Sequence, residues 1–364
     1  MNLKRELKCV RKKKKLVKIA LFTVLALTII FAALSMAGMK LVHDEQFGRF
    51  ERPEPGTTAE LHHLDLAGSY PLELVSFYSR QNRLQGYLYR TQNSPGLIVV
   101  AHGLGGGADS YIPHIRYFLD QGWSVFAYDA TGSYDSEGKG VGGFPQALVD
   151  LDAALNYVES RSDLAQLPIL LFGHSWGGYA VANILHFDHA VSGVVSIAGP
   201  SSAMEIMVEQ GVQMMGAAVM ATQRPFLWLY QWLVYGKTAA LNAVPALQQA
   251  QVPVLIIHGT GDNVVSFSGS GIISKRAKIT NPLVQFLALD EEGRNGHNNI
   301  FWSHECIAYV SGLNRELRAL AEQYGGELPI EVKRQFFSQV DRERANELNM
   351  ELMERINSFF LSCL

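Results

Sequence analysis

The pentapeptide Gly-His-Ser-Trp-Gly at residues 173–177 constrains the fold of this chain more than any other part of the sequence. The apolar run before it, residues 167–172, predicts a buried strand, and residues 178–185 after it predict the beginning of a helix. A strand, a tight turn and a helix in this order hold the central serine with its hydroxyl exposed beyond the end of the strand. Glycines on both sides allow the turn to close tightly. Ser175 is therefore a candidate nucleophile.

Two more polar residues follow predicted strands further along the chain. Residues 254–258 form an apolar run that leads into a glycine-rich turn with Asp262, and residues 284–289 precede a polar loop that holds His297. Sites in open α/β sheets form at the carboxyl ends of the strands. The order Ser175, Asp262, His297 matches the order of the catalytic triad in α/β-hydrolases.

Two further segments resemble loops of the α/β-hydrolase superfamily. The His-Gly-Leu-Gly-Gly run at 102–106 follows a predicted strand and resembles the oxyanion loop of that superfamily. Residues 128–138 look like the Asp-x-Arg-Gly-x-Gly-x-Ser-x-Gly loop of serine aminopeptidase-like and monoglyceride-lipase-like hydrolases, with Thr131 in place of the arginine. The resemblance covers roughly residues 70–310 and implies an α/β-hydrolase fold, which is a doubly wound, mostly parallel sheet with a helical cap insertion.

The residues also predict a mechanism. Serine is a weak nucleophile until a base takes its proton, so His297 would accept the proton of Ser175 while Asp262 orients the imidazole. The oxyanion that forms needs preorganised donors, and the backbone N–H of Trp176, next after the serine, is one of them. The resemblance implies that Leu104 supplies the other donor.

Rival residues exist for the base and for the acid. His304 is a second candidate base, but His297 lies closer behind its predicted strand. Asp290 is a second candidate acid, but the glycine-rich turn before Asp262 suits the role better. His174 lies inside the pentapeptide and is expected to point away from the serine.

The N-terminus carries a basic leader followed by an apolar run. Nine of the first eighteen residues are Lys or Arg. Residues 19–39 contain no charged residue, and about 20 apolar residues are enough for a helix to cross a bilayer. By the positive-inside rule, residues 1–18 stay in the cytoplasm and the rest of the chain lies outside. A cleavable signal peptide, cut after Ala37 in Ser-Met-Ala, is the alternative, but the run is long for one.

Both alternatives place the remaining chain outside the cytoplasm. The net charge of −3 gives no indication of nucleic-acid binding, and a basic run beside an apolar span favours membrane anchoring. We therefore predict a single-pass protein of the cell membrane, anchored by one N-terminal transmembrane helix.

The rest of the chain divides into a linker and one domain. Residues 40–69 are polar and irregular, with a His-His pair at 62–63, and predict a solvated stalk between membrane and domain. Residues 70–364 form the predicted α/β-hydrolase domain, in which a hairpin at 72–90 precedes alternating strands and helices. The last segment, 341–360, has apolar residues at helical spacing and predicts one amphipathic helix.

The alternation stops at about residues 201–250, where family members carry a cap over the active site. Methionine is adaptable and aromatic side chains are large, so the composition of this segment predicts an apolar substrate wall. A second interpretation is that these side chains simply pack the cap onto the core. A third interpretation of the run 225–233 is a further membrane contact, too short to span the bilayer. The predicted substrate-binding residues are Met207, Met214, Met215, Phe226, Trp228 and Trp232.

These features predict a serine hydrolase that cleaves carboxylic esters or thioesters of apolar acyl groups through an acyl-enzyme. An exopeptidase of the aminopeptidase type is the first alternative, with Glu205 and Glu209 of the cap as candidate anchors for a substrate amine. A membrane-tethered binding protein without catalysis is the second. The sequence contains no metal-ligand spacing, so neither a metal nor a cofactor is predicted. Cys306 and Cys363 could pair outside the cytoplasm, and the sequence leaves their state open.

Overall fold

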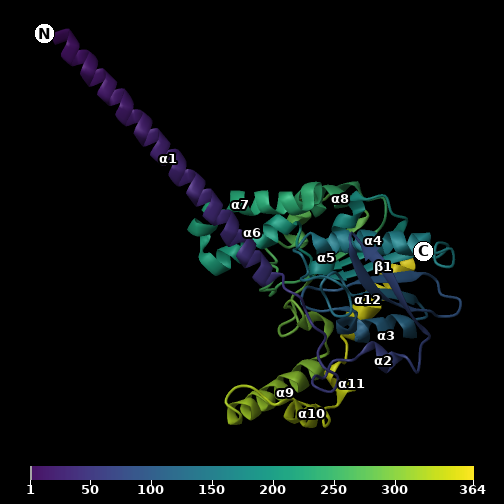
Figure 1. The fold of residues 1–364 in the computed structure, drawn as a ribbon. Coiled ribbons are helices and arrows are strands. Elements are labelled where there is room, and N and C mark those ends of the chain that lie inside the picture. The colour runs from purple at the N-terminus through teal and green to yellow at the C-terminus, as the bar shows by residue number, and fades with distance from the viewer. Residues whose placement is uncertain (1) are drawn as a thin grey trace.

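Eight strands form one sheet in the order β1-β2-β4-β3-β5-β6-β7-β8 in the computed structural model, which describes residues 2–364 (Figure 1). β1 and β2 form an antiparallel hairpin and β2 pairs antiparallel with β4, while all later neighbours are parallel. This mostly parallel sheet confirms the predicted α/β class. The strands are β1 (Leu72–Ser79), β2 (Asn82–Tyr89), β3 (Leu97–Ala101), β4 (Ser124–Tyr128), β5 (Ile169–His174), β6 (Val191–Ile197), β7 (Val254–Gly259) and β8 (Val284–Leu289).

The central strands are buried on both faces, as parallel strands covered by helices must be. Alternate residues of β3 enter two separate cores: Val99 faces one, and its neighbours Ile98 and Val100 face the other. One core lies under α4, α5 and α8, and the other lies under α3 and α12. The covering helices are α3 (Ile112–Asp120), α4 (Gln146–Ser160), α5 (Trp176–Asn183), α8 (Ala243–Gln249) and α12 (Met350–Ser362).

The cap insertion follows β6, where the sequence predicted it. It consists of two helices joined at Gly216, and short 3₁₀ helices occur before α8 and in several loops. α7 packs against α6 and against the N-terminal helix α1 (Figure 1). These elements are α6 (Ala203–Met215) and α7 (Ala217–Tyr235), with η1 (Ala108–Tyr111), η2 (Ile184–His186), η3 (Gly236–Ala240), η4 (Ile272–Lys278) and η5 (Asn299–Phe301).

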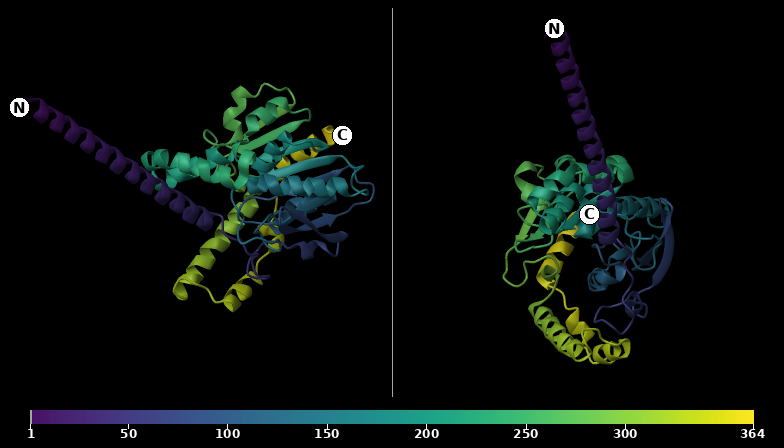
Figure 2. Two further views of the ribbon diagram at one scale, coloured as in Figure 1. Left: turned by 45° about the horizontal axis from the view of Figure 1, so that its top comes forward. Right: turned by 60° about the vertical axis from the view of Figure 1, so that its left-hand side comes forward.

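The N-terminal helix α1 (Asn2–Gln46) projects away from the body of the molecule, and only its C-terminal part lies beside the cap (Figure 2). The segment after it differs from the solvated, irregular stalk predicted for residues 40–69. Phe50 pairs with Ser133 in an isolated bridge, and Arg49 donates a hydrogen bond of 2.8 Å to the carbonyl of Ser136. Because Phe50 also packs on the main core, this segment is part of the folded body. The domain boundaries given from the sequence stay predictions.

The C-terminal region begins with two helices that extend from the sheet (Figure 1). The single amphipathic helix predicted for residues 341–360 is wrong, because two asparagines interrupt it. The Asn346 side chain donates to the carbonyls of Ala59 and Arg342, and Asn349 caps the next helix by accepting from Leu352 N. The remaining helices are α2 (His63–Leu66), α9 (His304–Gln323), α10 (Ile330–Phe337) and α11 (Arg342–Ala345).

Candidate active site

The turn between β5 and α5 holds Ser175 in an unusual backbone conformation, with φ 56° and ψ −113°. Its backbone N–H donates to the carbonyl of Ile197 over 2.8 Å, which fixes the turn to β6. A Cβ on Gly177 would lie only 1.9 Å from the carbonyl oxygen of Ala101, so no larger residue fits there. The close approach of the two backbones thus explains the glycine at position 177. The turn leaves the Ser175 hydroxyl beyond the end of the strand.

The three residues predicted to act together lie in one hydrogen-bonded chain. His297 Nε2 is 2.8 Å from Ser175 Oγ, and His297 Nδ1 is 2.7 Å from Asp262 Oδ2. Asp262 comes from the turn after β7, and His297 from the loop after β8. An ionised carboxylate only accepts hydrogen bonds, so Nδ1 donates to Asp262 and Nε2 is left to accept from the serine.

Asp262 is held as an ionised acceptor. Its Oδ1 accepts from the backbone N–H groups of Val264 and Val265, at 2.8 and 2.9 Å. His258 Nε2 lies 3.1 Å from its Oδ2. Burial by itself raises the pKa of Asp262, but the hydrogen bonds from His258 and His297 outweigh it and hold that pKa well below its usual range. The carboxylate therefore stays charged beside the imidazole at neutral pH.

His174 supports the histidine loop from behind, a role that the sequence did not predict. Its Nδ1 lies 2.7 Å from the hydroxyl of Tyr111, and its Nε2 lies 3.0 Å from the carbonyl oxygen of His297. Burial, and then the neighbouring His297, lowers the pKa of His174 far below its usual value. The neutral ring thus donates through Nε2 to His297, and the Tyr111 hydroxyl in turn accepts from Gly103 N over 3.0 Å. Both ring nitrogens of His174 thus contact groups other than the Ser175 hydroxyl.

The predicted oxyanion donors come from the beginning of α5 and from the loop after β3. Trp176 is the first residue of α5, where backbone N–H groups have no carbonyl partner within the helix. Leu104 lines the same pocket as Ser175, and its loop is held by His102, whose Nε2 accepts from Ala130 N over 2.9 Å. Burial lowers the pKa of His102 to about 4, so it accepts as a neutral ring.

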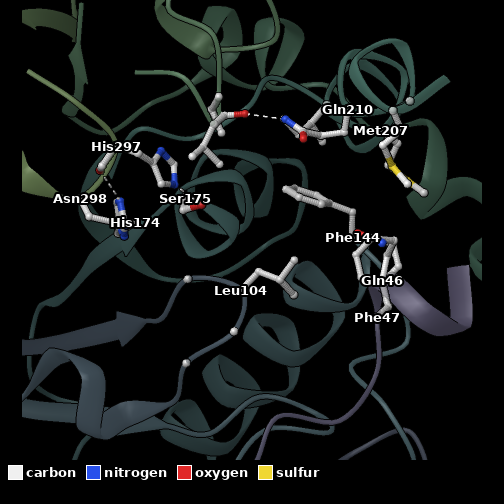
Figure 3. Close-up of a pocket in the computed structure, with 18 of the residues that line it drawn as sticks. Gln46, Phe47, Leu104, Phe144, His174, Ser175, Met207, Gln210, His297 and Asn298 are labelled. Atoms are coloured by element: carbon white, nitrogen blue, oxygen red, sulfur yellow. Dashed lines mark hydrogen bonds between the residues drawn. The ribbon is translucent and has the colours of Figure 1, made fainter. Parts of the chain in front are cut away.

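The pocket around the serine has a volume of about 780 Å³. Figure 3 shows Ser175 beside His297, with Gln46 and Phe47 at the opposite side of the pocket. These two residues belong to the end of the N-terminal helix and the segment just after it, and the sequence analysis placed both of them in the solvated stalk. Helix α1 therefore forms one wall of the pocket, together with methionines of the cap.

The predicted substrate-binding residues divide into two groups. Met207, Met214 and Met215 line the pocket, as predicted. Trp228 and Trp232 are 50% and 48% exposed on the outer side of α7, and their rings stack at 6.4 Å. Phe226 meets the ring of Phe31 on α1 edge to face, at 5.6 Å. Among the described residues, these three aromatic side chains do not line the pocket, so their prediction is wrong. α7 is apolar on nearly all sides, and composition alone could not tell its inner face from its outer face.

The His-His pair of the predicted stalk is not solvated. His63 is buried with Nδ1 3.0 Å from Asp109 Oδ1, and His62 Nε2 lies 3.3 Å from Asp109 Oδ2. These three side chains could reach a common metal ion. Arg52 Nε already lies 2.8 Å from Asp109 Oδ2, so the guanidinium supplies the positive charge at this carboxylate. The cluster fits an ion-paired structural contact that holds the N-terminal segment.

The rival residues lie elsewhere. His304 Nε2 contacts Glu291 at 2.6 Å on the exposed surface, and Asp290 is exposed. Cys306 and Cys363 both have free thiols; their Sγ atoms contact backbone carbonyls at 3.2 Å, those of Ala345 and Phe359.

Comparisons with known proteins agree with this architecture. The family model described as "Serine aminopeptidase, S33" matches residues 92–229. The uncharacterized protein YfhR of Escherichia coli (strain K12) is 25% identical over 221 residues, covering 58% of this chain and 70% of that protein. The monoglyceride lipase of Homo sapiens is 25% identical over 264 residues, covering 62% of this chain and 85% of that protein.

The solved structure of an esterase from Pyrococcus furiosus has the same fold. It superimposes with a TM-score of 0.52 at 18% identity, covering 76% of this chain and 98% of that chain. The α/β-hydrolase fold predicted from the elbow, the triad order and the two glycine-rich loops is therefore confirmed.

Proposed function

We propose that this chain, an α/β hydrolase of the esterase, lipase and aminopeptidase type, is a serine hydrolase that cleaves carboxylic esters or thioesters of apolar acyl groups. The single observation that carries the proposal is the hydrogen-bonded chain from Ser175 through His297 to Asp262, at 2.8 and 2.7 Å. A serine is activated when a neighbouring base takes its proton, and this chain offers that base with its orienting acid.

In the proposed reaction, Ser175 Oγ attacks the carbonyl carbon while its proton passes to His297 Nε2. The N–H groups of Trp176 and Leu104 stabilise the oxyanion, and the protonated His297 then donates to the departing alcohol or thiol. Water next attacks the acyl-enzyme with His297 again as the base, which releases the carboxylic acid and restores Ser175. No cofactor is needed for these steps.

Covalent labelling tests the nucleophile. A fluorophosphonate should add to the full-length protein once by intact mass, and Ser175→Ala should abolish the adduct. Ser110→Ala, which changes another serine of the same pocket, should leave it in place. An adduct that survives in Ser175→Ala would refute the assignment, and no adduct on any variant would favour a protein that only binds.

Amide hydrolysis by an exopeptidase is the second candidate function. The cap carboxylates considered for it are engaged elsewhere: Glu205 lies 3.1 Å from Lys275, and Glu209 accepts from the backbone N–H groups of Ser266 and Ser270. Glu60 does line the pocket and could hold a substrate amine. A panel of p-nitrophenyl esters and aminoacyl p-nitroanilides separates the two functions, and faster cleavage of anilides, reduced by Glu60→Gln, would favour the peptidase.

We also propose that α1 anchors the protein in the cell membrane with the N-terminus in the cytoplasm. Within residues 2–364, one helix is long and apolar enough to cross a membrane, the part of α1 from Leu7 to Gln46. Nine Lys and Arg residues precede its uncharged run and support the orientation. Protease added to intact cells should digest the hydrolase domain and spare an N-terminal tag, whereas a protected domain would reverse the topology. A mature chain that begins at Gly38 would replace the anchor with a signal peptide.

A further inference from the structure

The outer face of cap helix α7 is unusual for a water-exposed surface. The 19 residues of α7 include one charged side chain, Arg224. Trp228, Trp232 and Leu233 are 50%, 48% and 62% exposed. Large exposed apolar patches mark interaction sites, and exposed tryptophans are enriched where a protein meets the membrane–water boundary.

The position of α7 along α1 sets its level relative to a membrane. The uncharged run 19–39 lies between Lys18 and Lys40. At about 1.5 Å per residue, this run matches a hydrocarbon core of about 30 Å, so the helix has little freedom to slide. Phe31 therefore lies about 12 Å inside the boundary that Met39 defines. The ring of Phe226 on α7 meets Phe31 at 5.6 Å, which brings α7 to the same level.

An apolar seam joins this level to the active-site pocket. Met39 of α1 clusters with Met220 and Leu227 of α7 in a small buried core. The same three residues line the pocket that contains Ser175. An acyl chain that enters between α1 and α7 beside these three residues thus meets an apolar surface that continues into the pocket.

We propose that α7 lies in the outer leaflet of the membrane beside α1, and that the pocket receives its substrate from the bilayer. Lipid then covers the exposed face of α7. The substrate class is an amphiphilic acyl ester whose chain already lies among the lipids. The inference rests on the proposed ester hydrolysis and on the proposed anchor, and it specifies which esters reach the serine.

Tryptophan quenching by lipid tests the position of α7. Full-length protein is reconstituted in phosphatidylcholine vesicles that contain a lipid brominated on its acyl chains. Trp228→Phe/Trp232→Phe should remove most of the quenching seen in the unchanged protein. Trp123→Phe is the matched control, because Trp123 is buried and should not contribute. Quenching that is the same with and without the α7 tryptophans would overturn the proposal and favour a second copy or another protein on this face.

Activity tests the delivery of the substrate. Trp228→Glu/Trp232→Glu should lower hydrolysis of a monoacyl ester held in vesicles by about tenfold or more, since charged side chains are costly to place within the bilayer. Hydrolysis of water-soluble p-nitrophenyl butyrate should stay within about twofold, because these side chains lie outside the pocket. Leu74→Glu/Leu361→Glu, at two exposed positions on β1 and α12, is the control for added charge. Equal rates on vesicles for both double variants would refute the delivery route, while unchanged labelling of Ser175 would leave the proposed function standing.

Discussion

At one end of the pocket every side chain of the proposed triad is fixed by hydrogen bonds, whereas at the other end the wall consists mostly of methionines and other apolar side chains, with a few polar ones such as Gln46 among them. Ser175, Asp262 and His297 all follow strands of the sheet, and their partners lie at 2.7 to 2.9 Å. The opposite wall comes from α1 and the cap, which are attached to the sheet but are not part of it. For the proposed hydrolase, the difference predicts that the sheet determines the chemistry and the attached helices determine which substrate is accepted.

The catalytic end should be sensitive to the loss of a single charge. Asp262→Asn keeps the shape of the side chain but removes the ionised acceptor of His297 Nδ1. We expect kcat on p-nitrophenyl butyrate to fall by about 10⁴-fold with little change in KM. Asp290→Asn, at the exposed rival position, should leave kcat unchanged. A small effect of Asp262→Asn would mean that another group orients the histidine.

The apolar end should instead be sensitive to volume. Val42 of α1 lines the pocket, while its neighbour Leu41 is 71% exposed. In the unchanged protein, kcat/KM should rise about 30-fold from acetate to hexanoate esters. This rise corresponds to the burial of two to three further methylenes, each of which contributes about 0.8 kcal/mol. Val42→Trp should remove this preference and spare acetate, and Leu41→Trp should keep it. If both variants behave alike, α1 does not form the acyl wall in solution.

His174 supports the end of the pocket that holds Ser175, because it contacts the backbone of His297. His174→Phe leaves the Tyr111 hydroxyl and the His297 carbonyl without their partner. We expect kcat to fall about tenfold and the free energy of unfolding to fall by about 1–3 kcal/mol. A double-mutant cycle with Tyr111→Phe should be clearly non-additive, because both changes break one chain of hydrogen bonds. Additive effects would argue against a shared role.

The smallest expected effect is a pH dependence of stability. Hydrogen bonds hold the pKa of Asp262 below the ordinary value of 3.8 when the protein is folded. A lowered carboxyl pKa contributes stability above the unfolded value and loses it as the pH falls through the folded value. Urea unfolding of the full-length protein in detergent should thus show stability falling below about pH 4, and less steeply for Asp262→Asn. Equal slopes would mean that the hydrogen-bond partners of Asp262 do not lower its pKa on folding.

The sequence predicted that Ser175, Asp262 and His297 come together because the signals there are local. Strand, turn and helix residues adjoin Ser175, and the other two triad residues each follow an apolar strand. The apolar runs at 254–258 and 284–289 fall on β7 and β8. The secondary structure around such residues can be predicted from the spacing of apolar residues and from the turn-forming residues beside them.

The sequence failed where a contact joins distant segments. The bond between His174 and Tyr111 spans 63 residues, and no spacing rule relates them. The sequence also gave no indication that the end of α1 forms a wall of the pocket. Residues 40–47 look polar, and the residues that line the pocket together with them lie in the cap and in the loop at 102–106. The tryptophans of α7 were misplaced because an almost entirely apolar helix has no polar face to mark the outside.

The backbone of Ser175 has one further consequence, for how such a chain changes over generations. A residue other than glycine with φ 56° and ψ −113° carries local strain, typically about 1–3 kcal/mol. Ser175→Gly should therefore unfold at higher denaturant concentration than Ser175→Ala, although neither could form an acyl-enzyme. Selection for stability alone would favour glycine at this position, so the serine is expected to persist only where the proposed reaction is under selection. A descendant with glycine at this position would be expected to retain the fold, gain stability and have lost the reaction.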